Sequence, residues 1–126
     1  MCGIAGAIAF TEEGKKKLDL IHEATACLAL RGPDAEGFFK DTHIALGHRR
    51  LSIIDTSNAG TQPFSDETGR YTIIFNGEFF NYKEHREKLI AQGIHLKSES
   101  DTEVLLHLYM QEGEKCLQKI NGFNEL

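Results

Sequence analysis

The chain has 126 residues, of which 40% are hydrophobic and 26% charged, and its formal net charge is -5. This length fits one compact domain with a small core. Because nucleic-acid binding draws its affinity from clustered Lys and Arg, the acidic balance argues against a polyanion as partner. The one basic run, Lys15-Lys16-Lys17, would point in different directions on a helix, so we interpret it as solvated surface.

The apolar start, Ile4 to Phe10, is too short to span a bilayer, lacks a basic region before it and runs directly into acidic residues. We therefore expect neither an export signal nor a membrane segment. The cysteines Cys2, Cys27 and Cys116 are odd in number and widely spaced, and no histidine has a familiar metal-ligand spacing. This pattern favours a reducing cytoplasm and argues against a metal site.

The first third of the chain predicts a strand and then a helix. Residues 3 to 10 (GIAGAIAF) form an apolar run typical of a buried strand, which places position 2 at its beginning. From Glu13 to about Leu30, apolar residues recur at helical spacing until Arg31-Gly32-Pro33-Asp34 stops the pattern. The apolar positions of this helix are Leu18, Ile21, Ala24, Thr25 and Leu28.

The middle of the chain predicts short strands and a long loop. Three apolar segments are interpreted as strands: Glu36 to Lys40, His43 to Gly47 and Leu51 to Asp55. Residues 56 to 66 are rich in turn formers and predict a loop. A further strand is predicted over residues 70 to 76 (RYTIIFN), ending in the turn signal Asn76-Gly77.

Two helices are predicted in the last third. Asn81 can cap a helix over Tyr82 to Gln92, with Leu89 and Ile90 on its inner side and Gly93 ending it. Ser100 and Glu103 have capping-box spacing ahead of an apolar helical pattern. Because strands and helices alternate without a strict βαβ rhythm, the sequence favours an α+β fold.

Cys2 is the candidate nucleophile. Removal of Met1, which is ordinary before a small residue, would leave a thiol and a free α-amine on the same residue. With a pKa of about 7.7 to 8.0, that amine can take the proton of the thiol near neutrality. The alternative is that Cys2 is a chance or small core residue, but a strand from Ile4 would hold a catalytic terminus in place.

Hydrolysis of a carboxamide also needs oxyanion donors and charges that recognise the substrate. Asn76 offers a side-chain NH2 beside the unencumbered backbone N-H of Gly77, although a plain hairpin turn is the alternative. Arg50 could bind an α-carboxylate and Asp101 an α-ammonium group. An ordinary surface charge at Arg50 and an ordinary first-turn acid at Asp101 are the alternatives.

Taken together, the motifs resemble the class II glutamine amidotransferases, which are N-terminal-nucleophile hydrolases, and within them the glutaminase domain of asparagine synthetase. The resemblance covers nearly the whole chain in order. It rests on the segments MCGIAG (1–6), RGPD (31–34), LGHRRLSIID (46–55), QP (62–63), NGE (76–78), NY (81–82) and SDTEV (100–104).

The resemblance implies a four-layered αββα sandwich in which Cys2 attacks the side-chain amide of glutamine to give a γ-glutamyl thioester and ammonia. It assigns Arg50 to the α-carboxylate, Asn76 and Gly77 to the oxyanion hole, and Asp101 to the α-ammonium group. The main chain of Leu51, Ile53 and Ile54, together with Glu78, would line the pocket. No cofactor is implied for this domain, since ATP and magnesium belong to the synthetase domain.

Two departures from the family pattern stand out. Phe79-Phe80 replaces the usual Ile-Tyr, which keeps two large apolar side chains. After Phe123 the family continues into further strands, so we expect a domain that is incomplete at its C-terminus, with an exposed sheet edge open to self-association.

We expect no synthetase domain within these 126 residues, and we expect a synthetase domain or subunit as the partner, with aspartate as the ammonia acceptor in the family. The alternative function is a catalytically silent remnant that binds glutamine or a protein. A third reading is an unrelated α+β binding domain.

Overall fold

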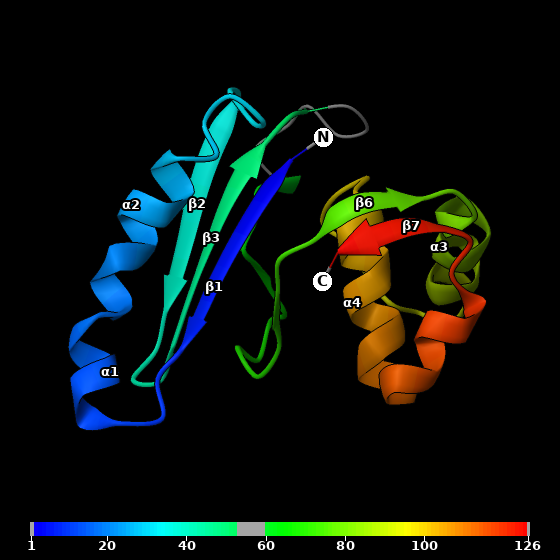
Figure 1. The fold of residues 1–126 in the computed structure, drawn as a ribbon. Helices are drawn as coiled ribbons and strands as arrows, with labels where there is room; N and C mark the ends of the chain where they lie inside the picture. The colour runs from blue at the N-terminus through cyan, green and yellow to red at the C-terminus, as the bar shows by residue number, and fades with distance from the viewer. Residues whose placement is uncertain (1, 53–59, 126) are drawn as a thin grey trace. The chain divides into compact units, whose positions relative to one another are not determined.

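A computed structural model of the chain describes residues 2–52 and 60–125, and Figure 1 shows it as a ribbon. The described residues form two compact units. Unit 1 contains residues 2–52 and 61–63, and unit 2 contains residue 60 and residues 64–125. Both units combine helices with antiparallel strands, which confirms the predicted α+β class.

Unit 1 is built on a three-stranded antiparallel sheet in the order β1-β3-β2 (Figure 1). Its strands are β1 (Gly3–Ile8), β2 (Ala35–Lys40) and β3 (Ile44–Arg50). The register pairs Gly3 with Arg49 and Ala35 with Arg50. The beginning of β1, the beginning of β2 and the end of β3 therefore lie at one end of the sheet, and Cys2 comes immediately before β1, as predicted.

Small residues let a helix pack closely on this sheet. The helical segments of unit 1 are α1 (Glu12–Lys16), the 3-10 helix η1 (Leu18–Leu20) and α2 (Ile21–Ala26), and α2 contacts both β1 and β3. A Cβ at Gly47 on β3 would overlap the hydroxyl of Thr25 on α2. The core under the helices contains Ala9, Leu18, Ile21 and Ala45, with Ala5 and Ala7 packed against it.

The single helix predicted from Glu13 to about Leu30 is wrong, because this stretch divides into three short segments followed by turns. α1 buries no residue, and burial begins at Leu18. The predicted inner residue Ala24 is exposed, whereas Thr25 is buried and donates its hydroxyl to Ile21 O at 2.7 Å. Close packing of this segment on the sheet, rather than helical periodicity, determines where its helices begin and end.

β3 is longer than the sequence pattern indicates. The predicted strand from His43 to Gly47 continues through Arg50, because β1 and β2 pair with β3 on its two sides. Of the predicted strand Leu51 to Asp55, Leu51 and Ser52 lie outside any strand, and residues 53 to 55 fall outside the described residues. The strand predicted from Glu36 to Lys40 is confirmed as β2.

Unit 2 contains two small antiparallel pairs. β4 (Phe64–Ser65) pairs with β5 (Thr72–Ile73), and β6 (Asn76–Phe79) pairs with β7 (Gly122–Glu125). The single strand predicted over residues 70 to 76 is therefore interrupted, and the turn predicted at Asn76-Gly77 is wrong. Both residues belong to β6, where pairing with β7 overrides the local turn preference.

The two predicted helices of unit 2 are confirmed as α3 (Tyr82–Ala91) and α4 (Asp101–Glu112), and the 3-10 helix η3 (Gly113–Lys119) follows. Gly93 has a φ of 85° just beyond α3, as expected of a terminating glycine. Asn81 occupies the N-cap position of α3 but makes no side-chain cap bond. Ser100 does cap α4, since its hydroxyl accepts from Thr102 N at 3.1 Å.

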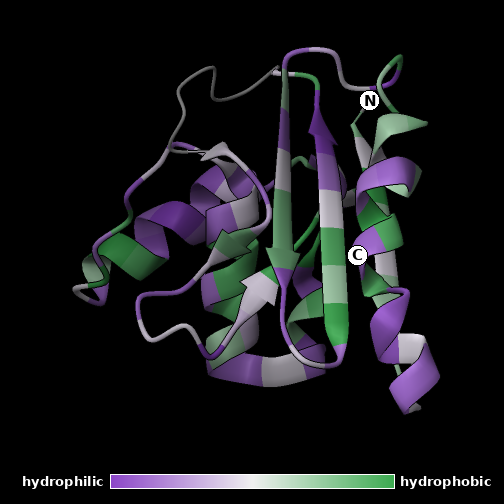
Figure 2. Ribbon diagram, turned by 90° about the vertical axis from the view of Figure 1, so that its left-hand side faces the viewer, coloured by the Kyte–Doolittle hydropathy of each residue, from purple (hydrophilic) through white to green (hydrophobic). Residues whose placement is uncertain are grey.

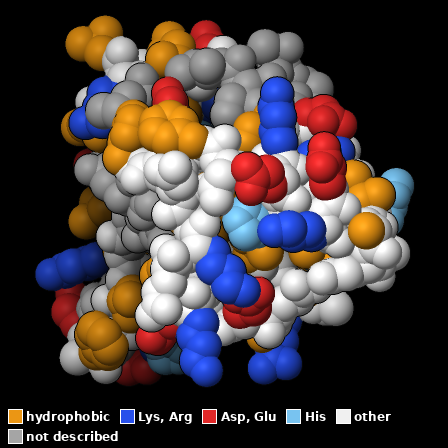
Figure 3. All heavy atoms as spheres, turned by 90° about the vertical axis from the view of Figure 1, so that its right-hand side faces the viewer, with side chains coloured by type: hydrophobic (Ala, Val, Ile, Leu, Met, Phe, Trp, Pro, Cys, Tyr) orange, Lys and Arg blue, Asp and Glu red, His pale blue; other side chains and the backbone are white. Residues whose placement is uncertain are grey.

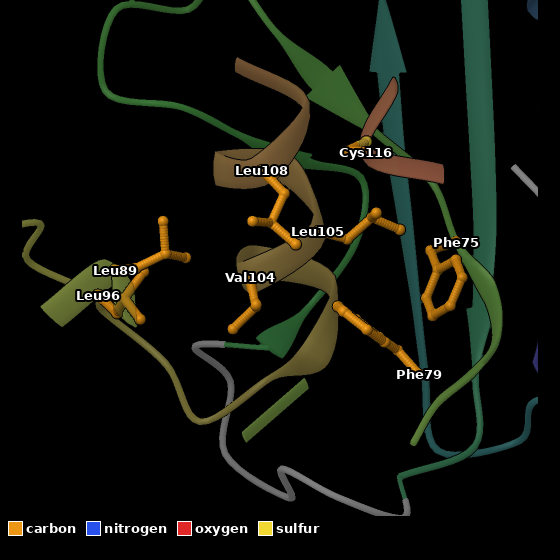
Figure 4. Close-up of a cluster of buried hydrophobic side chains, with 8 residues drawn as sticks. All are labelled: Phe75, Phe79, Leu89, Leu96, Val104, Leu105, Leu108 and Cys116. Atoms are coloured by element: carbon orange, nitrogen blue, oxygen red, sulfur yellow. The ribbon is translucent and has the colours of Figure 1, made fainter. Parts of the chain in front are cut away.

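An apolar cluster holds unit 2 together (Figure 4). It contains Phe75, Phe79, Leu89, Leu96, Val104, Leu105, Leu108 and Cys116. Leu89 faces this cluster as predicted, but Ile90 is 51% exposed, so the prediction that Ile90 lies on the inner side of α3 is wrong. Successive helix positions point in different directions, and only one of the two can face α4.

Hydrophilic and hydrophobic residues, and charges of both signs, are mixed along the helices and on the surface. Helices carry hydrophilic as well as hydrophobic residues along their length (Figure 2), and among the described residues no helix is long and apolar enough to cross a membrane. On the face drawn in Figure 3, basic and acidic side chains are intermingled rather than segregated. Ion pairs in unit 2 include Arg86 with Glu99 at 2.8 Å and Lys119 with Glu112 at 2.7 Å.

Candidate functional site

The thiol of Cys2 lies against the chain that follows β3. Its Sγ accepts from Leu51 N at 3.4 Å and lies 3.7 Å from Leu51 O, to which the thiol can donate. Cys2 is partly buried, whereas Cys27 is exposed and Cys116 fully buried. The backbone N-H and C=O of Leu51 together fix the position of the Cys2 sulfur at the end of β3.

A second contact fixes the backbone of Cys2. Arg31 Nε donates to Cys2 O at 3.2 Å, from the turn that follows α2. Next in the chain, a Cβ on Gly3 would lie 2.8 Å from the Cβ of Leu28, so glycine lets β1 approach the end of the helical segment. Residue 2 is thus held from the α2 side and from the β3 side.

The turn Arg31-Gly32-Pro33-Asp34 also packs against the end of β3 and forms hydrogen bonds with it. Gly32 is buried against the strand, and a Cβ there would overlap Arg49 and lie 2.6 Å from Arg50 N. Asp34 N donates to Arg50 O at 3.0 Å, and Asp34 Oδ2 accepts from Ser52 N at 2.7 Å. The same turn therefore positions both Cys2 and the segment that its thiol contacts.

The contacts of this turn with Cys2 and with the end of β3 were not predicted from the sequence. From the sequence, the turn was expected only to end a helix, and it contributed to the family resemblance. The available signal was the combination of an arginine, a glycine and an acidic residue within four positions of a turn. Their partners, 16 to 29 residues away in sequence, could not be identified without the fold.

The predicted carboxylate ligand, Arg50, is the last residue of β3 and is 7% exposed. It precedes Leu51, so unit 1 brings together the candidate nucleophile, Cys2, and the candidate cation for the substrate. Ile53 and Ile54, predicted to line the pocket through their main chain, lie outside the described residues.

Unit 2 carries the remaining predicted site residues. Asn76, Gly77 and Glu78 are consecutive on β6, where Asn76 is buried and the other two are partly buried. Asp101 is the first residue of α4 and is 7% exposed. Its Oδ2 accepts from Phe79 N at 3.3 Å, which ties the beginning of α4 to the end of β6. This hydrogen bond links the strand that carries the predicted oxyanion pair to the helix that carries the predicted ammonium ligand.

Burial raises the pKa of Asp101 above its usual range, and the nearby carboxylate of Glu78 adds to the increase. The backbone N-H groups of Phe79 and Thr102 act in the opposite direction, by stabilising the ionised form. A buried acid of this kind binds a cation more strongly than a solvated acid does, because the charge pair forms in a medium of low dielectric constant.

The α3-α4 connection contains a buried carboxylate whose role the sequence did not indicate. Glu103 is 1% exposed, and it accepts from Lys97 N at 2.8 Å, Ser98 N at 2.7 Å and Ser98 Oγ at 2.6 Å. The capping box predicted for Ser100 and Glu103 is therefore wrong in its second half, since Glu103 holds the preceding loop instead of Ser100 N. This network fixes the loop that delivers Asp101.

No cluster of three or more His, Cys, Asp or Glu side chains is arranged to hold a metal ion within residues 2–52 and 60–125. The groups that the described residues do present are a thiol beside a backbone N-H, a buried arginine, a carboxamide on a strand and a buried carboxylate. The first two groups belong to unit 1 and the last two to unit 2. In unit 1, a cysteine placed directly ahead of the first strand is the candidate nucleophile.

Comparison with known families identifies the family of this chain. The model of the family described as "Glutamine amidotransferase domain" matches residues 1–125. The chain therefore belongs to the glutamine amidotransferase domain family.

Curated relatives agree with this membership. The chain is 44% identical over 127 residues to asparagine synthetase [glutamine-hydrolyzing] 1 of Bacillus subtilis, which covers 97% of this chain and 20% of that protein. It is 37% identical over 124 residues to asparagine synthetase [glutamine-hydrolyzing] 3 of the same organism, with the same coverage. A putative asparagine synthetase of Methanocaldococcus jannaschii is 39% identical over 140 residues, covering 97% of this chain and 26% of that protein. The chain thus spans about a fifth to a quarter of these relatives' length.

Proposed function

We propose that the chain is the glutaminase part of an asparagine-synthetase-type amidotransferase, which hydrolyses L-glutamine to L-glutamate and ammonia. The observation that carries the proposal is the placement of the Cys2 thiol, ahead of β1 and 3.4 Å from Leu51 N, in a chain of this family. The names of the relatives, which include "glutamine-hydrolyzing", support the choice of substrate. No observation on the described residues favours the catalytically silent alternative.

In the proposed reaction, Met1 is first removed and the free α-amine of Cys2 takes the proton of the thiol. The thiolate attacks the side-chain carbonyl carbon of glutamine, and the resulting oxyanion is stabilised by the Asn76 side chain and Gly77 N-H. Collapse of this intermediate breaks the C-N bond and releases ammonia, with the proton returned by the amine. Water then hydrolyses the thioester, giving glutamate and restoring the thiol.

Recognition of glutamine is proposed to use two opposite charges. Arg50 binds the α-carboxylate through its planar fork, and Asp101 binds the α-ammonium group. Glu78 and the main chain of Leu51, Ile53 and Ile54 line the pocket. A charge-assisted hydrogen bond contributes about 1.5 to 3 kcal/mol, so loss of either charge would weaken glutamine binding by at least about tenfold.

We also propose the context in which this domain works. Residues 1–126 would form part of a four-layered αββα sandwich, in which the domain itself needs no cofactor. The ammonia would pass to an acceptor, aspartate in the family, held by a synthetase domain or subunit that uses ATP and magnesium. Self-association through an exposed sheet edge is the proposed alternative to a synthetase partner at that edge.

The proposal is tested by measuring ammonia released from glutamine by the des-Met chain, its Cys2→Ala variant and a Cys27→Ala control. Cys27 is an exposed thiol in the same unit, so its loss should leave the rate unchanged. We expect Cys2→Ala to abolish the release. No release by the processed wild-type chain, or equal release by the Cys2→Ala variant, would contradict the proposal.

A further inference from the structure

The side-chain hydrogen bonds of Asn81 are not those of a helix cap. It occupies the N-cap position of α3, yet its side chain bonds to the last residue of η3 and to the chain just before β7. Its Oδ1 accepts from Asn121 N at 2.8 Å, and its Nδ2 donates to Lys119 O at 3.0 Å. Both hydrogen-bonding functions of one carboxamide are thus used on a segment about 40 residues away in sequence.

Further contacts strengthen this junction between residues 80–81 and residues 119–123. Phe80 N donates to Asn121 O at 2.8 Å, so that Asn121 is held through both its backbone groups. The rings of Phe80 and Phe123 pack edge to face with centroids 5.9 Å apart. Asn81 Nδ2 also lies 3.4 Å from Nε2 of the buried His85, whose ring lies 5.5 Å from that of Phe79. The junction combines a fixed carboxamide with aromatic packing.

The segment held by Asn81 leads directly into β7. β7 has four residues and pairs with β6 in a register that sets Phe79 against Gly122 and Asn76 against Glu125. A Cβ at Gly122 would overlap Glu78 O, so the strands approach closely at the end of the ladder nearest Asn81. Such a short strand has few pairings of its own, and anchoring at its beginning determines where it lies.

β6 is the strand that carries Asn76 and Gly77. We propose that Asn81 is a positioning residue for this oxyanion pair, acting through Asn121 and β7 on the backbone of β6. The inference rests on the proposed function. Asn81 does not contact the reacting atoms in this scheme, and its effect is to hold the two donors where the oxyanion develops. Misplacement of such donors by a fraction of an ångström to 1 Å weakens transition-state binding by up to about 100-fold.

The test compares the des-Met wild-type chain with Asn81→Ala, and uses Gln111→Ala as control. Gln111 makes a 2.8 Å side-chain hydrogen bond to Gln92 at exposed positions of the same unit, so its loss removes a comparable bond elsewhere. The readouts are kcat and KM for glutamine, the affinity for the product glutamate, and the affinity for glutamate γ-semialdehyde. The semialdehyde adds the Cys2 thiol to its carbonyl group, and the oxygen of that adduct needs the oxyanion donors.

We expect Asn81→Ala to lower kcat and semialdehyde affinity together by about 10- to 100-fold, while KM and glutamate affinity change less than about threefold. Amide hydrogen exchange should become faster at Asn121 and along β7. Asn81→Asp, which keeps the acceptor for Asn121 N but loses the donor to Lys119 O, should fall between wild type and Asn81→Ala. If Asn81→Ala does not fold, the Asn81→Asp and Gly122→Ala variants give the same readouts, and each should lower kcat and semialdehyde affinity without changing glutamate affinity.

Unchanged kcat in Asn81→Ala, or a parallel loss of glutamate and semialdehyde affinity, would overturn the inference and leave the proposed function intact. A wild-type chain that neither hydrolyses glutamine nor binds the semialdehyde would instead overturn the proposed function, and this inference with it.

Discussion

The Sγ of Cys2 lies 3.4 Å from the backbone nitrogen of Leu51, a residue 49 positions further along the chain. Antiparallel pairing of β1 with β3 makes this contact possible, because it sets Gly3 against Arg49 and so brings Cys2 to the end of β3, where Leu51 follows. The contact places a hydrogen-bond donor at the sulfur and places the thiol next to Arg50. It is the structural basis of the proposed nucleophile.

Asp34 should support this arrangement without touching the substrate. In an Asp34→Ala variant the amide of Ser52 loses its acceptor, so the segment after β3 loosens near the Cys2 thiol. We expect kcat/KM for glutamine to fall about tenfold, and the free energy of unfolding to fall by about 1 kcal/mol. Steady-state ammonia release and urea denaturation measure the two effects. Asp34→Asn keeps an acceptor oxygen and should restore most of both, and equal losses in the two variants would argue against the hydrogen bond as the cause.

Gly32 should tolerate no side chain. A Cβ there would overlap the backbone of Arg49, which cannot move aside as a flexible side chain could. We expect Gly32→Ala to lower the free energy of unfolding by about 1 to 3 kcal/mol, measured by urea denaturation. Gly6→Ala is the matched control, since its Cβ would lie 3.5 Å from Leu46 Cδ2, an ordinary contact. A Gly32→Ala variant as stable as Gly6→Ala would show that the turn does not pack on β3 as described.

Asp101 should make binding and stability depend on pH in opposite directions. Its pKa is raised by burial, so the folded state holds a proton more tightly than the unfolded chain does. As pH rises from the ordinary aspartate pKa through the raised value, this residue therefore costs stability, whereas the ionised form needed to bind an ammonium group appears only above the raised value. We expect KM for glutamine to increase as pH falls through that window.

An Asp101→Asn variant should separate the two effects. It removes the cost of a buried charge, so at neutral pH the variant should unfold at a higher urea concentration than wild type while KM for glutamine increases by at least about tenfold. Asp66→Asn is the contrasting control. The hydroxyl of Thr68 and the backbone N-H of Tyr71 lower the pKa of Asp66, so its stabilising contribution is present at neutral pH and is lost as pH falls. A loss of stability in Asp101→Asn would contradict the assigned sign.

Glu103 should be among the costliest polar side chains of unit 2 to remove. Replacement by Ala leaves Lys97 N, Ser98 N and Ser98 Oγ without their acceptor at a position that is 1% exposed. We expect the free energy of unfolding to fall by about 3 kcal/mol in thermal or urea unfolding. Glu12→Ala, which removes an exposed pair with Lys15, should cost less than about 1 kcal/mol. Similar losses in the two variants would refute the network.

The sequence predicted the features that depend on local pattern. The strand after Cys2, the helices at 82 and 101, the cap at Ser100 and the terminating Gly93 all follow from apolar spacing and from turn or cap chemistry. The α+β class followed from the same evidence. The family was indicated by the ordered motifs, and the match over residues 1–125 confirms it.

Features that depend on distant partners could not be predicted in this way. The break between α1 and α2 and the extension of β3 to Arg50 are set by packing and pairing with other segments. Asn76-Gly77 has a strong local preference for a turn, and pairing with residues 47 and 49 positions further on in the chain overrides it. For the same reason the roles of Arg31, Asp34 and Asn81 were not visible, since each acts on a partner remote in sequence.

The most direct test of the account is the intact mass of the purified chain after incubation with diazo-oxo-norleucine, a glutamine-like electrophile, with Cys2→Ala as control. We expect a chain without Met1 that carries a single adduct, and a Cys2→Ala variant that carries none although Cys27 is exposed. A chain that retains Met1, a processed chain that stays unlabelled, or an adduct that persists in Cys2→Ala would contradict the claim that Cys2 is the activated nucleophile of a glutaminase.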